Sequence, residues 1–182
     1  MTISNGGTVL IAYDGSAPAQ DAVAQAARLF PDSAALVVTA WHSLAAASVA
    51  ARAALPEDMI RLAVERLDAA AEADASRTAQ EGADRARSAG LTASPLTIRA
   101  EPSVWASIVA AAEQHDVRAV LVGSRGRSGL RSAVLGSVSN AVVHHCRRPV
   151  VVVHPAEART RDLTQCAESQ PLGRESGSIR AR

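Results

Sequence analysis

The sequence contains few aromatic residues and no lysine. Aromatic residues make up 2% of the 182 residues, so the core has to be built from Ala, Val, Leu and Ile, which the 48% hydrophobic content supports. Closely packed Ala-rich helices leave little room for a large internal cavity, so we expect any ligand at the edge of a sheet. All 19 basic residues are Arg, and no Gly-Lys-Ser/Thr triplet occurs. A Walker A phosphate-binding loop is therefore excluded.

Other absences narrow the class of protein. The two cysteines, Cys146 and Cys166, have no metal-binding or redox spacing. No apolar run approaches the roughly 20 residues that span a membrane, and no signal peptide is evident. The net charge of +1 offers no electrostatic case for nucleic acid. We therefore expect a cytoplasmic protein with free thiols that binds neither membranes nor nucleic acid.

Short apolar runs alternate with helical patterns along the chain. The runs predict strands at 8–13, 35–41, 92–99, 119–122 and 149–153. Between them we expect a helix capped by Ser16, a long helix from Pro56 to a C-cap at Gly90, a helix capped by Ser103, and a helix over 137–146. Most strands are apolar on both faces, which is typical of a parallel sheet covered by helices. The predicted fold is α/β and Rossmann-like, with a single five-stranded parallel sheet and helices on both faces.

The chain is expected to form one domain over residues 8–154. A short flexible N-terminus, 1–7, precedes it. The pattern stops after it, and a polar tail over 155–182 is predicted to be disordered.

Two turns contain residues suited to ligand binding. One is the Asp14-Gly15-Ser16 turn after the first strand, and the other is the Gly- and Ser-rich stretch 123–137 after the fourth. Ligands of doubly wound sheets bind beyond the carboxyl ends of the strands, where the strand order reverses. The usual order 3-2-1-4-5 would make these two strands neighbours. Glycines let backbone N–H groups approach phosphate, the helix starting at Ser137 favours an anion, and Arg125, Arg127 and Arg131 add charge. The residues alone predict an anion site, with a structural glycine loop as the alternative.

Gly123, Gly126, Gly136 and Ser137 match the pattern Gly-x2-Gly-x9-Gly-Ser/Thr. With VLIAYDGS at the start and HHCRRPVVVV at the end, residues 8–154 resemble the ATP-binding branch of the universal stress protein family. The resemblance implies that ATP lies on this loop and that its adenine is read by the backbone at 40–41. It further implies that Asp14 helps to hold the nucleotide and its Mg²⁺. The nucleotide-binding residues implied in this way are Asp14, Ala40, Trp41, Gly123, Ser124, Arg125, Gly126, Gly136, Ser137, Val138 and Ser139.

Several of these residues have a simpler interpretation. Asp14 can be a turn and capping residue, and Trp41 can belong to the rim of the core. His42 follows the second strand and could reach the pocket, but a surface loop residue is the favoured interpretation. His144, His145 and Cys146 are not expected to bind a metal, because adjacent residues on a helix point in different directions and no fourth ligand is evident.

The resemblance implies a homodimer, which pairs through residues 150–153 at the predicted sheet edge. The predicted function is that of an ATP-binding, nucleotide-dependent regulator in the stress response, not an enzyme. No catalytic constellation is evident, and neither the His-x-Gly-His nor the Ser-Gly-Gly-x-Asp-Ser signature of adenylyl-transferring enzymes occurs. A nucleotide-free dimeric interaction module and a slow ATPase are the alternatives.

Overall fold

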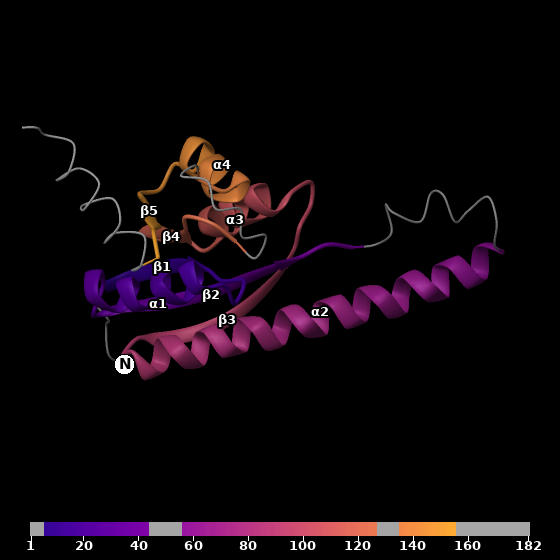
Figure 1. Ribbon diagram of the computed structural model, residues 1–182, viewed down its shortest axis with the longest axis horizontal. Helices are drawn as coiled ribbons and strands as arrows, with labels where there is room; N and C mark the ends of the chain where they lie inside the picture. Colours follow the sequence, from indigo (N-terminus) through magenta and orange to yellow (C-terminus); the bar gives the residue numbers. More distant parts are fainter. Residues whose placement is uncertain (1–5, 44–55, 127–134, 156–182) are drawn as a thin grey trace, which may run out of the picture.

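The computed structural model describes residues 6–43, 56–126 and 135–155. Five strands alternate with four helices in this part of the chain (Figure 1). In chain order the elements are β1 (Gly6–Ala12), α1 (Ala17–Leu29), β2 (Ser33–Trp41), α2 (Glu57–Ser88), β3 (Thr92–Arg99), α3 (Val104–Gln114), β4 (Ala119–Gly123), α4 (Ser137–His145) and β5 (Val150–Val153).

The strands form one parallel sheet of order β3-β2-β1-β4-β5, which confirms the predicted fold. Strand β1 lies at its centre, with Leu10 opposite both Leu36 of β2 and Val120 of β4. The strand order reverses between β1 and β4, since β2 and β3 lie on one side of β1 and β4 and β5 lie on its other side. The carboxyl ends of these two strands are therefore neighbours, as the site prediction requires.

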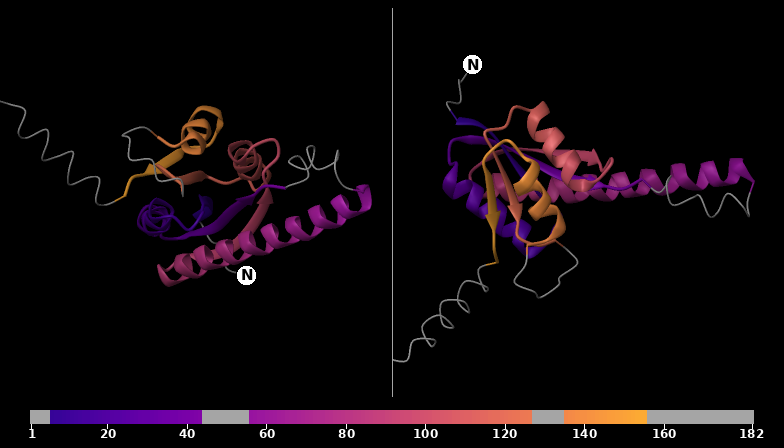
Figure 2. Two further views of the ribbon diagram at one scale, coloured as in Figure 1. Left: turned by 45° about the vertical axis from the view of Figure 1, so that its right-hand side comes forward. Right: turned by 90° about the horizontal axis from the view of Figure 1, so that it is seen from above.

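Two helices cover each face of the sheet (Figure 2). Helices α1 and α2 enclose a core cluster that includes Val9, Ile11 and Leu121, and helices α3 and α4 enclose a second cluster that includes Leu10 and Val120. The alternation of side chains along a strand produces this division, since successive residues point to opposite faces. Many residues facing the strands are alanines, which lets the helices approach the sheet closely.

The predicted helix ends are largely confirmed. The hydroxyl of Ser103 accepts a hydrogen bond from the Ala106 N–H at 3.4 Å. Helix α2 ends in a Schellman motif, because Gly90 has a φ of +95° and the N–H of Leu91 bonds to the carbonyl of Ala86 at 3.0 Å. Ser16 occupies the N-cap position of α1, but its side chain makes no capping hydrogen bond.

Several boundaries differ from the prediction by one or two residues, and two of these differences have a clear basis. Strand β1 begins at Gly6, where it pairs with Ser33, so part of the expected flexible N-terminus belongs to the sheet. Strand β5 begins at Val150, one residue later than predicted, because Pro149 has no N–H to donate. The tail from residue 156 onward, Arg127, Arg131 and Cys166 lie outside the described residues. No helix in the described part of the chain is long and apolar enough to cross a membrane.

Candidate functional site

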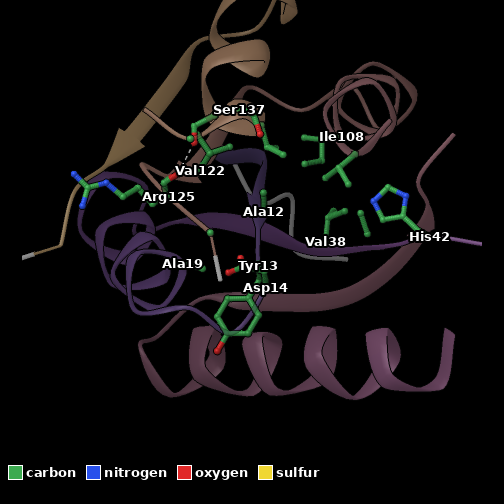
Figure 3. A pocket seen from close by; sticks show the side chains of 17 residues that line it. Ala12, Tyr13, Asp14, Ala19, Val38, His42, Ile108, Val122, Arg125 and Ser137 are labelled. Atoms are coloured by element: carbon green, nitrogen blue, oxygen red, sulfur yellow. Dashed lines mark hydrogen bonds between the residues drawn. The ribbon is translucent and has the colours of Figure 1, made fainter. Parts of the chain in front are cut away.

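A pocket of about 460 Å³ opens at the carboxyl ends of β1, β2 and β4 (Figure 3). This volume falls within the usual range for small-molecule sites, about 300–1,000 Å³. The sheet contributes its floor, and α3 and the start of α4 contribute the opposite wall. The lining residues are Ala12, Tyr13, Asp14, Ala19, Val38, Ala40, His42, Val104, Ile108, Val122, Gly123, Arg125, Gly126, Gly136, Ser137, Val138 and Ser139.

The structure brings together all but two of the predicted site residues in this pocket. The two that do not line it are Trp41 and Ser124. Trp41 lies on the other face of the sheet, where the Arg99 guanidinium stands 5.7 Å from the centre of its ring. Its carbonyl accepts a hydrogen bond from the Ala100 N–H at 2.7 Å and is therefore already engaged. Ser124 is buried below the loop, at 1% exposure.

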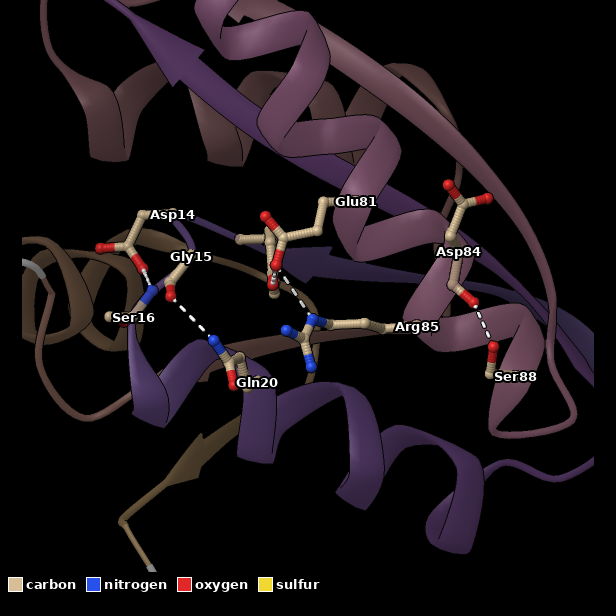
Figure 4. Close-up of polar contacts among 9 residues, drawn as sticks. Asp14, Gly15, Ser16, Gln20, Glu81, Asp84, Arg85 and Ser88 are labelled. Carbon is tan, nitrogen blue, oxygen red and sulfur yellow. Dashed lines mark hydrogen bonds and ion pairs between the residues drawn. The ribbon is translucent and has the colours of Figure 1, made fainter.

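The turn after β1 is fixed by hydrogen bonds of its own residues (Figure 4). The Oδ1 atom of Asp14 accepts from the backbone N–H of Ser16 at 3.0 Å, and Gln20 donates to the carbonyl of Gly15 at 3.0 Å. Gly15 has a φ of +80°, a conformation that residues with a Cβ rarely adopt. Asp14 is thus a turn-forming residue that also lines the pocket, so both interpretations from the sequence apply to its position.

The two ends of the loop after β4 are held together at their bases. The N–H of Gly136 donates to the carbonyl of Ser124 at 2.8 Å. The Ser139 hydroxyl lies within hydrogen-bonding distance of both Gly123 O, at 3.0 Å, and Ser124 O, at 3.2 Å. Ser124 in turn donates its N–H to Val153 of β5 at 2.7 Å. Ser124 and Ser139 therefore hold the loop in place, with Ser139 also lining the pocket.

The three motif glycines have different surroundings. A Cβ at Gly126 would stand 2.9 Å from Asp14 Oδ2, so the turns after β1 and β4 are in direct contact there. A Cβ at Gly123 would stand 2.8 Å from Pro18 Cβ and 2.9 Å from the Pro18 carbonyl carbon, inside the start of α1. At Gly136 the nearest atoms would be 3.4 Å away, which leaves room for a methyl group. Gly123 is therefore fixed by packing, whereas Gly126 and Gly136 keep the loop surface open.

Two buried hydroxyl groups in these turns lack hydrogen-bond partners in the described structure. They are Ser16 Oγ after β1 and Ser124 Oγ after β4; a third, Ser33 Oγ, lies at the other end of the sheet. Buried polar atoms usually find a partner in protein or water. Both hydroxyls belong to the turns whose residues line the pocket, although neither Ser16 nor Ser124 lines it.

Tyr13 connects the pocket to α2. Its ring points away from the cavity (Figure 3), and its hydroxyl donates to Glu81 at 3.0 Å. Burial, followed by the hydrogen bond and the negative charge of Glu81, raises the pKa of Tyr13 from 10.0 to about 12. Hydrogen bonds from Arg85 and then Tyr13 lower the pKa of Glu81. A neutral phenol and a charged carboxylate are thus the stable forms of this pair.

His42 is one of several lining residues that were not among the predicted binding residues. It follows β2, is exposed to solvent, and shares the pocket side of the strand with Val38 and Ala40. The alternation of side chains could have identified it, because a residue two positions after Ala40 faces the same way if the chain stays extended. The structure therefore agrees with the alternative interpretation, in which His42 reaches the pocket, and His42 is exposed as well.

No group of three or more His, Cys, Asp or Glu residues that could hold a metal occurs in the described parts of the chain. His145 instead stacks on Trp105, with ring centroids 4.5 Å apart. Cys146 is a partly buried free thiol.

The universal stress protein family model matches residues 7–154 of this chain. Universal stress protein Rv2005c of Mycobacterium tuberculosis is 64% identical over 33 residues, which are 18% of this chain and only 11% of that protein. UspA from Lactobacillus plantarum has a similar structure, with a TM-score of 0.63 at 16% identity over 81% of this chain and 97% of that one. A universal stress protein in complex with cAMP gives 0.54 at 22% identity, over 83% and 98% of the two chains.

The two solved structures support the fold alone at these identities, whereas the family model covers most of the sequence. The strand order and the α/β fold agree with that match. The chain therefore belongs to the universal stress protein family.

Proposed function

We propose that the chain binds ATP with Mg²⁺ in this pocket and acts as a nucleotide-dependent regulator. The observation that carries the proposal is the meeting of the two turns, where Asp14 Oδ2 lies directly against Gly126. A ligand in the pocket then touches a carboxylate from one turn and a glycine-rich backbone from the other. This combination suits a phosphorylated ligand with a bound cation.

The phosphates would lie at the start of α4. Gly136 occupies the N-cap position, and no side chain caps this helix. The first N–H groups of a helix have no partner within it, and the helix dipole adds positive potential there. Ser137 offers a hydroxyl at the same place, and Arg125 adds a positive charge at that side of the pocket.

The base and ribose would occupy the apolar part of the pocket. Small residues of the sheet, Ala12 and Ala40, leave a flat surface facing Ile108 of α3. An apolar slot next to a few converging polar groups is typical of small-molecule sites. The cAMP complex of a related fold supports an adenine nucleotide as the class of ligand.

The residues fit a magnesium ion that arrives with the nucleotide. Mg²⁺ binds through one or two carboxylates together with substrate phosphates and water, not in a cage made entirely of protein. Asp14 is the one carboxylate among the lining residues that the structure describes. The ion would neutralise phosphate charge next to it.

We also propose that the protein is a homodimer that pairs through β5. This strand is at the sheet edge, and Val150, Val151 and Val152 are only partly buried. An apolar edge strand is a template for pairing with another chain. The cytoplasmic location stays a prediction from the sequence.

The nucleotide content of freshly purified protein, followed by titration of the emptied protein with ATP and Mg²⁺, tests the ATP proposal. Gly126→Val should abolish binding, since its side chain displaces Asp14, and should preserve the fold because only a flexible side-chain end is in the way. Gly7→Val is the matched control, as its Cβ would meet Arg118 at an ordinary 3.4 Å at the other end of β1. Absence of nucleotide and of ATP binding in the wild type, or normal affinity in Gly126→Val, would contradict the proposal.

A further inference from the structure

The hydrogen-bonding side chains of the pocket are unevenly distributed. Asp14, Arg125, Ser137 and Ser139 all belong to the turns after β1 and β4. Tyr13 lines the pocket too, but its hydroxyl bonds to α2 on the other face of the sheet. Among the described lining residues, His42 is therefore the single side chain at the apolar end that is able to form a hydrogen bond.

His42 lies at that end, on the far side of the pocket from Arg125 (Figure 3). The alternation of β2 brings it there: Val38, Ala40 and His42 face the pocket, while Trp41 faces α2 and stacks against Arg99. Pairing of β2 with β3 over its whole length, from Ala34 to Trp41, keeps the strand extended up to this point and fixes the face on which His42 emerges.

The slot next to His42 has aliphatic walls. Val38 and Ala40 form one side, and Val104 and Ile108 of α3 form the other. A flat aromatic base fits such a slot with its faces against aliphatic carbon. Its polar edge is then directed out of the slot, where an imidazole can meet it. One ring nitrogen of a neutral imidazole donates a hydrogen bond and the other accepts one, so the ring can pair with either an acceptor or a donor on the edge of the base.

We propose that the His42 imidazole hydrogen-bonds the edge of the nucleotide base and so selects a base-bearing ligand over a bare polyphosphate. The inference rests on the proposed ATP site and adds a base-reading residue to it. The turns after β1 and β4 hold the phosphates, and the imidazole at the opposite end recognises the base. Affinity for the triphosphate group alone should then be independent of residue 42.

The test compares ATP with inorganic tripolyphosphate, both with Mg²⁺, by titration calorimetry on the emptied wild type and three variants. His42→Ala and His42→Phe should each lose about tenfold in ATP affinity, as expected for one lost hydrogen bond. His42→Gln, which keeps a donor and an acceptor on a flexible stem, should retain most of it. Tripolyphosphate affinity should be the same in all four proteins.

The possible failures are distinct. Three results would overturn the role of His42 but leave the nucleotide site intact. The first is an unchanged ATP affinity in His42→Ala, and the second is an equal loss of affinity for ATP and tripolyphosphate. The third is a loss of ATP affinity in His42→Gln as large as in His42→Ala. A wild type that binds neither ligand would overturn the nucleotide site as well. Because His42 is exposed, all variants should unfold at the wild-type temperature.

Discussion

Replacement of Gly82 by alanine should destabilise the protein, although alanine is the better helix former. Gly82 lies in α2 where the helix crosses Tyr13 and Val37. A Cβ there would stand 2.7 Å from Tyr13 Cδ1, 2.8 Å from Tyr13 Cγ and 2.8 Å from Val37 Cγ1. Favourable carbon contacts lie at about 3.5–4.0 Å, so three atoms would have to move apart.

Neither neighbour of Gly82 can yield easily. Tyr13 is 2% exposed and its hydroxyl is bonded to Glu81, while Val37 is fully buried. Overpacking of such a core costs about 1–3 kcal/mol, and we expect the upper end here. The gain in helix propensity from glycine to alanine offsets about 1 kcal/mol. The net loss should be about 2 kcal/mol, or about 4–8 °C in Tm for a chain of this size.

Urea unfolding followed by far-UV circular dichroism measures this loss as a lower midpoint at an unchanged slope. Ser76→Ala, at an exposed position of the same helix, is the control and should leave the midpoint unchanged or slightly raised. The double variant with Val37→Ala should lose less than the sum of the single losses, because one of the three close contacts is removed. A higher midpoint in Gly82→Ala would refute the argument from close packing.

Gly123→Ala should lower the free energy of unfolding by about 1–3 kcal/mol, because its Cβ would meet the backbone of α1, whereas Gly136→Ala should be neutral. Equal losses for the two variants in thermal or urea unfolding would contradict the different packing of these two glycines. The pKa of Tyr13 is raised from 10.0 to about 12, so its contribution to the stability of the fold is complete below pH 10 and is lost as the pH rises from 10 to 12. Tyr13→Phe should remove this part of the pH dependence of the unfolding free energy, and an unchanged dependence would show that another group causes it. Val151→Glu should convert the proposed dimer to monomers or insoluble protein, measured by light scattering after gel filtration, and a soluble, unchanged dimer would exclude pairing through β5.

The sequence alone determined the fold class and most of the site. Apolar runs of strand length alternating with helical patterns allow few arrangements, because most of the strands are apolar on both faces and the sheet therefore needs helices on both sides. The capping residues Ser103 and Gly90 are local signals, set by their own backbone geometry. The glycine spacing after β4 pointed to a stretch of backbone that does line the pocket, at Gly123, Gly126 and Gly136.

Only the tertiary structure decided which face of β2 borders the pocket. Strand alternation puts Trp41 and His42 on opposite faces, and residues of α3 complete the pocket on the face of His42. The three motif glycines look equivalent in the sequence, yet Gly123 packs on α1, Gly126 meets Asp14 and Gly136 has room to spare. These differences come from contacts between segments far apart in the chain, and local patterns do not encode such contacts.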